Sequence, residues 1–169
     1  MEAVDIKTTP VPSAATIDDI PVYVELGKQV HSITRFKNYD YNEKRMEQQL
    51  RAIIDNVKGS HCFFVAENDN NEPLGWLLGC TESHLFSEHA IASVINYGVV
   101  PNKRMGGAGL RLLTAFRKWA ENRGAVELNA GVNSGIDLDK MDRFLRKLGF
   151  ELTGGNYSLG LVKVNHINN

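Results

Sequence analysis

Apolar residues recur at three- and four-residue intervals in two early stretches of the chain, which predicts two helices. The acidic pair Asp18 and Asp19 stands before Pro21, a signal for the start of the first helix. Its apolar stripe is Tyr23, Leu26, Val30 and Ile33. The second helix ends at Gly59, and its stripe is Met46, Leu50, Ile53, Ile54 and Val57. The residues before these helices, 1–17, are interpreted as a leader or a first short strand.

Shorter apolar runs predict strands after these two helices, at 62–66, 74–80, 91–100 and 126–132. A third helix is expected to follow a glycine-rich turn and to end at Gly124, with the stripe Leu112, Leu113, Phe116, Trp119 and Ala120. A fourth begins at Asp137 or Asp139 and has the stripe Met141, Phe144, Leu145 and Leu148. The turn Gly154-Gly155-Asn156 predicts a final hairpin between strands at 150–153 and 157–164.

This order of elements predicts one mixed α/β (α+β) domain around a single sheet of six to seven strands with four helices. The domain is expected to span residues 18–164, and 165–169 form a tail. A length of 169 residues, with 43% apolar and 23% charged residues, is typical of one globular domain. The net charge of -1 argues against a strongly basic nucleic-acid-binding protein.

Cysteine usage and the ends of the chain add little chemistry of their own. Cys62 and Cys80 lie in apolar strands and are interpreted as reduced core residues, and no cysteine or histidine spacing indicates a metal site. No segment reads as a signal peptide or as an apolar run of the ~20 residues that span a bilayer. We therefore expect a cytoplasmic protein that has no membrane partner.

The glycine-rich turn from Arg104 to Gly109, between a strand and a helix, is the most informative motif. Glycines let the backbone approach a ligand closely, and the free N–H groups of the following helix attract a phosphate. A Walker loop is excluded because Gly109 is followed by Leu110 and Arg111, not by Lys and Ser or Thr. A dinucleotide fingerprint is excluded because the third glycine is missing.

The segment 99–109 (VVPNKRMGGAG) resembles the acetyl-CoA-binding segment of the Gcn5-related N-acetyltransferases (GNAT), in which Arg/Gln-x-x-Gly-x-Gly/Ala opens a helix. Residues 144–150 (FLRKLGF) are similar to the FYEKLGF segment of the same family. The resemblance covers about residues 60–164. The ending LGFELTGGNYSL is also similar to bacteriophage-encoded members of the family.

The resemblance implies a GNAT fold and an N-acetyltransferase whose co-substrate is acetyl-CoA. An amine acceptor, on a small molecule or a protein, would attack the thioester directly, and no metal would be needed. Backbone groups at Tyr97, Val99 and Val100 would pair with the pantetheine arm, and Arg104, with Arg111, would add charge beside the pyrophosphate. The remaining coenzyme-binding residues implied are Met105, Gly106, Gly107, Ala108, Gly109, Leu110 and Asn133.

The catalytic acid and base do not follow the family pattern. The position of the usual acidic tyrosine holds Leu145, and 91–100 contain no Asp or Glu. Tyr97 and Tyr157 are the candidate catalytic acids, because a phenol is protonated at neutral pH and can donate to a thiolate. The polar loop 81–90, with two histidines and two glutamates, is expected near the acceptor entrance.

Two alternatives to an amine N-acetyltransferase stay open. One is an enzyme of this fold that modifies a nucleic acid or an aminoacyl-tRNA, which the near-neutral charge argues against. The other is a non-catalytic module that binds acetyl-CoA for regulation. A homodimer is expected from the family resemblance and from the apolar last strand, 157–164, which could pair at a sheet edge.

Overall fold

One five-stranded sheet forms the centre of the structure, a computed structural model that describes residues 11–100 and 107–161. The strand order is β1-β2-β3-β4-β5, antiparallel from β1 to β4, with β5 parallel to β4. The strands are β1 (Ser13–Ala14), β2 (His61–Glu67), β3 (Pro73–Ser83), β4 (Ala90–Val99) and β5 (Glu127–Ala130). The predicted fold class is therefore confirmed, with β1 inside the stretch that was interpreted as a leader or first strand.

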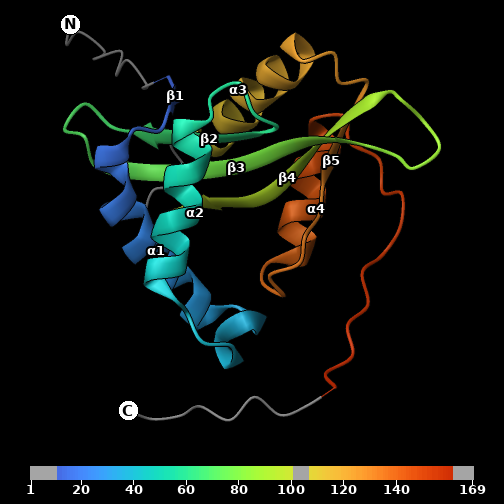
Figure 1. The fold of residues 1–169 in the computed structure, drawn as a ribbon. Helices are drawn as coiled ribbons and strands as arrows, with labels where there is room; N and C mark the ends of the chain where they lie inside the picture. Colours follow the sequence, from blue (N-terminus) through green and yellow to red (C-terminus); the bar gives the residue numbers. More distant parts are fainter. Residues whose placement is uncertain (1–10, 101–106, 162–169) are drawn as a thin grey trace, which may run out of the picture.

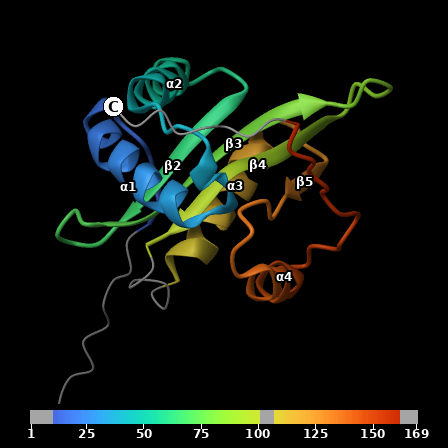
Figure 2. The ribbon, with the colours of Figure 1, turned by 90° about the horizontal axis from the view of Figure 1, so that it is seen from below.

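Helices cover both faces of this sheet (Figure 1). They are α1 (Ile20–Ile33), α2 (Glu43–Asp55), α3 (Ala108–Asn122) and α4 (Leu138–Lys147), with short 3-10 turns η1 (Ile17–Asp19) and η2 (Arg35–Asn38). Figure 2 shows α1 and α2 on one side of the sheet and α3 and α4 on the other. The four helices predicted from the apolar stripes are all present, each within a few residues of its expected start.

Strand alternation divides the core into two parts. Leu77 of β3 packs with Leu112 and Phe116 of α3, whereas its neighbours Trp76 and Leu78 pack with residues of α1 and α2. Successive side chains of a strand point to opposite faces, so β3, which is buried along most of its length, supplies both cores. Strand β3, at the centre of the sheet, thus packs against both helical layers.

Local signals explain where the helices begin and end. The Asn42 side chain accepts a hydrogen bond from the Arg45 N–H at 2.8 Å, which satisfies one free donor at the start of α2. The chain leaves α3 and α4 through Gly124 and Gly149, whose φ angles of 73° and 88° lie in the left-handed region that favours glycine. Gly124 is the stop position that the sequence indicated for the third helix.

The final hairpin was predicted wrongly. Residues 151–161 form no strand, and the described sheet has five strands, fewer than the predicted six to seven. In Figure 1 this segment, in red, runs down beside the molecule and away from the sheet. Alternating apolar residues form a strand only where a neighbour pairs with the backbone and covers one face, and here Leu159 is 84% exposed and Leu161 87%.

In the described part of the chain, no helix is long and apolar enough to cross a membrane.

Candidate active site

An opening between β4 and β5 creates the candidate site. The two strands pair only from Ile91 to Val94 of β4, opposite Glu127 to Ala130 of β5. Strand β4 continues to Val99, while β5 ends at Ala130. The register between β3 and β4 also shifts at Ile95, where a bulge turns β4 and leaves this side chain 54% exposed. The last part of β4 therefore has no strand partner on its β5 side among the described residues.

Backbone alternation decides which groups face this open edge. The Val100 N–H donates to the Leu74 oxygen of β3 at 2.9 Å, so its backbone points into the sheet. In an antiparallel ladder neighbouring residues point to opposite sides, which turns the N–H and C=O groups of Val99 and Tyr97 to the open edge. The structure thus supports Tyr97 and Val99 as candidate partners for an extended ligand. It corrects the expectation for Val100, whose N–H is already bonded.

The N-terminus of α3 lies next to the end of β4 and presents free backbone donors. Gly107 has φ 72° and precedes the helix, and its carbonyl accepts from the Arg111 N–H at 3.2 Å. The N–H groups of the first helical residues, Ala108, Gly109 and Leu110, have no intrahelical acceptor. A Cβ on Gly107 would lie 3.5 Å from a terminal nitrogen of Arg111, so a guanidinium accompanies these donors. The predicted Arg104, Met105 and Gly106 lie outside the described residues.

Gly109 allows α3 to approach β4. A Cβ at this position would lie 2.3 Å from the Tyr97 hydroxyl oxygen and 3.2 Å from a methyl carbon of Val99. The glycine therefore serves helix–strand packing as well as access to the backbone. Burial under the helix raises the pKa of the Tyr97 phenol well above its usual range, which keeps it protonated.

A cavity of about 380 Å³ extends from the open edge toward α1 and α2. One wall comes from β4 and from the end of β5, with Val94–Tyr97 and Ala130–Ser134. The opposite wall comes from α1, η2 and α2, and it includes Tyr23, His31 and Tyr41. Both a coenzyme arm and an acceptor could enter this space, because its walls belong to different layers of the fold.

The loop after β5 is tied to the opposite wall by Arg35 of η2. The Arg35 Nε donates to the Asn133 carbonyl oxygen at 2.6 Å, and its backbone N–H donates to the Ser134 oxygen at 3.0 Å. The Asn133 side-chain oxygen accepts from the Asn156 amide at 2.8 Å. Asn133, a predicted coenzyme-binding residue, therefore lines the cavity in a loop that η2 holds in place.

Other residues that the sequence predicted for the site do not line the cavity. Tyr157 is 99% exposed and is absent from the cavity wall, because the hairpin expected to carry it over the site does not form. No residue of the loop 81–90 lines the cavity either, which corrects its expected place at the acceptor entrance. The views in Figures 1 and 2 show why: this connection between β3 and β4 projects from the end of the sheet. Leu145, at the usual tyrosine position, does line the cavity as an apolar side chain.

Three contributors to the site were missed by the sequence analysis. His31 had no motif around it, and Arg35 acts through a contact 98 residues away in the chain, which no local pattern can show. The third is Asn96, whose side-chain oxygen accepts from the Trp76 indole N–H at 2.6 Å and fixes the cavity floor. The polar character of Asn96 inside an apolar strand was the one available signal.

Cysteine and metal chemistry find little support in the described structure. Burial raises the pKa of the Cys62 thiol to about 12, so the residue behaves as a core side chain. Among residues 11–100 and 107–161, no three His, Cys, Asp or Glu side chains come together as a metal site would require.

Comparison with solved structures shows the same fold in several acetyltransferases. A transcriptional regulator from Bacillus halodurans superimposes with a TM-score of 0.72 at 17% identity, over 90% of this chain and 99% of that one. The aminoglycoside antibiotic 6'-N-acetyltransferase AAC(6')-Ih from Acinetobacter baumannii superimposes with a TM-score of 0.66 at 14% identity, over 88% of this chain and 95% of that one. AAC(6')-Iy, solved with the bisubstrate analogue CoA-S-monomethyl-acetylneamine, superimposes with a TM-score of 0.71 at 15% identity. The match again covers 88% of this chain and 95% of that one.

Sequence comparison adds the family. No curated protein matches this chain at a significant level. The sequence model of the Acetyltransferase (GNAT) family, however, matches residues 28–150, which include the open edge of β4, the start of α3 and most of the cavity lining. The chain therefore belongs to the GNAT acetyltransferase family.

Proposed function

We propose that this protein is an N-acetyltransferase that transfers an acetyl group from acetyl-CoA to an amine by direct attack. The observation that carries the proposal is the juxtaposition of two sets of free backbone groups. The open edge of β4 at Tyr97 and Val99 lies beside the N–H groups of Ala108, Gly109 and Leu110 at the start of α3, which have no acceptor among the described residues. An extended polar arm that ends in a pyrophosphate matches this pair of features.

The described residues fit such a co-substrate. The β4 edge would take the amide groups of the pantetheine arm, and Asn133 lines the cavity in the loop after β5, on the same wall as this edge. The α3 N-terminus would hold the pyrophosphate, assisted by the guanidinium of Arg111 beside Gly107. We propose the same role for Arg104, Met105 and Gly106 on the family motif.

The chemistry supplied by bound acetyl-CoA is an activated acetyl thioester. The Val99 N–H, at the open edge, would stabilise negative charge on the carbonyl oxygen, and the cavity would hold the amine in line with the carbonyl carbon. The Tyr97 phenol would donate a proton to the departing sulfur. Its position on the cavity wall favours it over Tyr157, for which the structure supplies no contact with the cavity.

A matched pair of substitutions at Gly107 tests the coenzyme site. Asp and Asn both tolerate a positive φ better than other residues, so Gly107→Asp and Gly107→Asn should fold alike at φ 72°. The aspartate places a negative charge where the pyrophosphate would bind, and the asparagine does not. We expect calorimetry to show acetyl-CoA binding weakened about tenfold or more by Asp relative to Asn, which corresponds to ~1.4 kcal/mol. Equal affinity of the two folded variants would contradict the proposed site.

A non-catalytic module that binds acetyl-CoA is the second candidate function. Its supporting observation is the apolar Leu145 on the cavity wall, where the family's usual acid would stand. Release of free thiol from acetyl-CoA in the presence of a pool of amines separates the two functions. Coenzyme binding without amine-dependent thiol release would favour the module.

A further inference from the structure

We propose that the acceptor is a compact primary amine on an aromatic or aliphatic body with no second cationic group, and that His31 accepts its ammonium proton. This inference rests on the proposed function, because it concerns the acceptor half of the same cavity. The acceptor wall, as the term is used below, is the part of the cavity formed by α1, η2, α2 and the residues between them. It carries the side chains Tyr23, Val30, Phe36, Tyr41, Met46 and Leu50.

The first observation is the absence of carboxylates from the cavity. None of the described residues that line it is Asp or Glu, and its lining is mainly aromatic and aliphatic. Of the stretches that the structure does not describe, 101–106 and 162–169 contain no acidic residue, whereas 1–10 contain Glu2 and Asp5. An apolar wall of this kind favours an acceptor with an apolar body. Burial of apolar surface contributes about 25 cal/mol of favourable free energy for each Å² removed from water.

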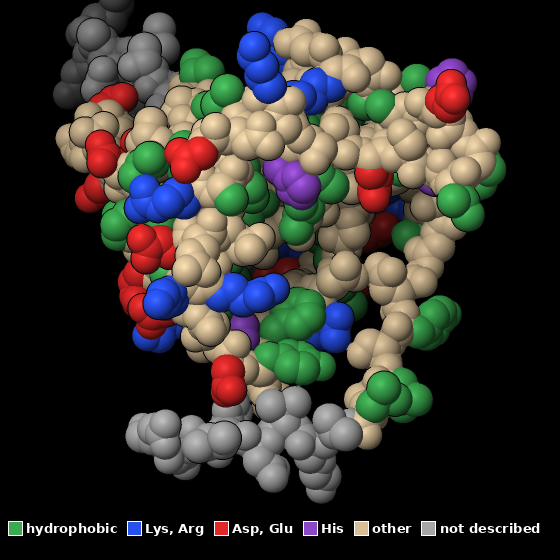
Figure 3. Space-filling view, in the orientation of Figure 1, with side chains coloured by type: hydrophobic (Ala, Val, Ile, Leu, Met, Phe, Trp, Pro, Cys, Tyr) green, Lys and Arg blue, Asp and Glu red, His purple; other side chains and the backbone are tan. Residues whose placement is uncertain are grey.

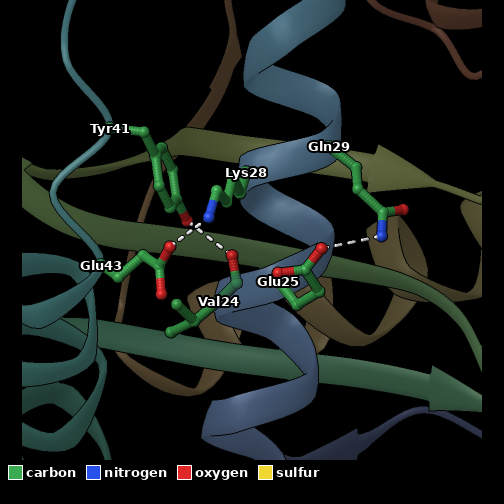
Figure 4. Close-up of polar contacts among 6 residues, drawn as sticks. All are labelled: Val24, Glu25, Lys28, Gln29, Tyr41 and Glu43. Atoms are coloured by element: carbon green, nitrogen blue, oxygen red, sulfur yellow. Dashed lines mark hydrogen bonds and ion pairs between the residues drawn. The ribbon is translucent and has the colours of Figure 1, made fainter. Parts of the chain in front are cut away.

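Two glutamates close to the acceptor wall, Glu25 and Glu43, have partners of their own (Figure 4). The Glu43 carboxylate pairs with the Lys28 ammonium, and Glu25 accepts a hydrogen bond from the Gln29 amide at 3.1 Å. Neither glutamate lines the cavity. In Figure 3 acidic and basic side chains alternate over the surface at the α1 side of the molecule, which leaves no single-sign patch there for a polycation.

A second groove contains acidic residues, but it lies beyond β5. Its walls include Glu121, Glu127 and Asp142, and none of its residues comes from α1, η2, α2 or β4. Glu121 pairs with Arg117 and Asp142 with Arg146. A polyamine or aminoglycoside in the main cavity would therefore bring several charges into an apolar space without partners, which is energetically costly.

The polar groups of the acceptor wall point to one proton acceptor. The Tyr41 hydroxyl donates to the Val24 oxygen at 2.9 Å, and the Tyr23 hydroxyl to the Gly75 oxygen at 3.4 Å. Thr34 is also bonded, since its hydroxyl donates to the His31 carbonyl oxygen at 3.0 Å. The His31 imidazole, by contrast, contacts the Tyr41 ring at 5.3 Å between centroids and makes no hydrogen bond to a described residue.

Imidazole chemistry suits this role. A neutral imidazole has a nitrogen lone pair that can accept a proton, whereas burial raises the pKa values of Tyr23 and Tyr41 and keeps both phenols protonated. Tyr41 contacts the His31 ring, Lys28 precedes His31 by three residues in α1 and pairs with Glu43, and Arg35 follows it in η2.

The step balances as follows. The ammonium R–NH₃⁺ gives one proton to a neutral His31 nitrogen and becomes a neutral amine. The amine lone pair forms the new C–N bond at the acetyl carbon, the C–S bond breaks, and the sulfur leaves with its electron pair. The sulfur takes up one proton from Tyr97, the second amine proton restores the phenol, and His31 returns its proton to solvent. The products are R–NH–CO–CH₃, free CoA thiol and H⁺.

The acceptor class is tested by thiol release with purified protein, acetyl-CoA and three probes: 2-phenylethylamine, spermidine and kanamycin. We expect kcat/KM for 2-phenylethylamine to exceed the kcat/KM of each polycation by about tenfold or more. This ratio corresponds to a difference of ~1.4 kcal/mol in activation free energy. A preference for spermidine or kanamycin would overturn the acceptor class and leave the acetyltransferase function intact. Acetyl-CoA binding by calorimetry with no acetylation of 2-phenylethylamine would also overturn it. Absence of acetyl-CoA binding would instead contradict the proposed function itself.

The role of His31 is tested with His31→Gln and a matched control, His84→Gln. The control histidine also stacks on an aromatic ring, Phe86, but lies in the projecting loop outside the cavity. We expect His31→Gln to lower kcat/KM at neutral pH by about 10²-fold, within the range of general base catalysis, and to remove the acidic limb of the pH profile. Affinity for acetyl-CoA should not change. An unaltered pH profile in His31→Gln, or the same loss in His84→Gln, would refute the assignment.

Discussion

Gly109 and Tyr97 form the closest helix–strand contact of the site, and this contact has a consequence for stability. A methyl group at Gly109 would lie 2.3 Å from the Tyr97 hydroxyl oxygen but 3.5 Å from the ring carbon that carries it. We expect Gly109→Ala to destabilise the protein by ~1–3 kcal/mol through overpacking. Adding Tyr97→Phe should restore part of the loss, because the clashing oxygen is gone.

Urea unfolding of the two single variants and the double variant gives the coupling energy between these positions. Gly154→Ala serves as the control, since a Cβ there meets no atom within 4 Å. Equal losses in the single Gly109→Ala variant and in the double variant would show that the hydroxyl is not the obstacle.

Tyr97 also allows a test of proton donation. We expect Tyr97→Phe to reduce turnover by at least ~10-fold while acetyl-CoA affinity stays nearly constant, because only the departing sulfur loses its donor. The pKa of this phenol is raised, so activity should show no alkaline decline from its ionisation below pH 9. Tyr157→Phe, at an exposed position, is expected to turn over like the wild type. Unchanged turnover in Tyr97→Phe would identify water as the proton source.

At the scale of elements, Arg35 couples η2 to the loop between β5 and α4. Its bonds to the Asn133 and Ser134 oxygens are the contacts that close one end of the cavity. Arg35→Ala removes the charged donor to Asn133 and should weaken acetyl-CoA binding about fivefold, the equivalent of ~1 kcal/mol for one hydrogen bond. Hydrogen exchange in 131–137 should become faster at the same time.

Lys37→Ala is the matched control for Arg35, because it removes another cation from the same 3-10 turn, η2. We expect it to leave both the affinity and the exchange of the loop unchanged. Equal effects of the two substitutions would mean that net charge, and not the tether to the loop, governs coenzyme affinity.

At the scale of the whole molecule, we propose that the chain forms a homodimer through its C-terminal segment. Strand β5 is an edge strand of the described sheet, and the neighbouring residues Leu152, Tyr157, Leu159 and Leu161 are 71–99% exposed. An open sheet edge is a ready template for pairing with a second copy, and a partner would also cover these exposed apolar side chains. Light scattering at tens of micromolar should give the mass of a dimer. A monomer for the wild type, or an unchanged dimer in the double variant Leu159→Lys, Leu161→Lys, would refute this interface.

Sequence alone determined the helices, four of the strands and the glycine-rich segment that resembles the family motif, because each of these depends on local order. A helical stripe, a capping residue such as Asn42 or a terminal glycine acts within a few neighbours, and the glycine turn of α3 is a continuous segment. Family membership followed from the same local segments, and the comparisons confirmed it.

Only the tertiary structure decided what faces the cavity. His31 lines the cavity, and Arg35 of η2 bonds the loop after β5, a contact between residues about a hundred positions apart. The same reason explains the failed hairpin: the apolar alternation in 151–161 resembles a strand, but a strand exists only where a partner edge is within reach. Local patterns specify which elements form. Which side chains share a site depends on contacts between residues far apart in the chain, and local sequence patterns do not show these contacts.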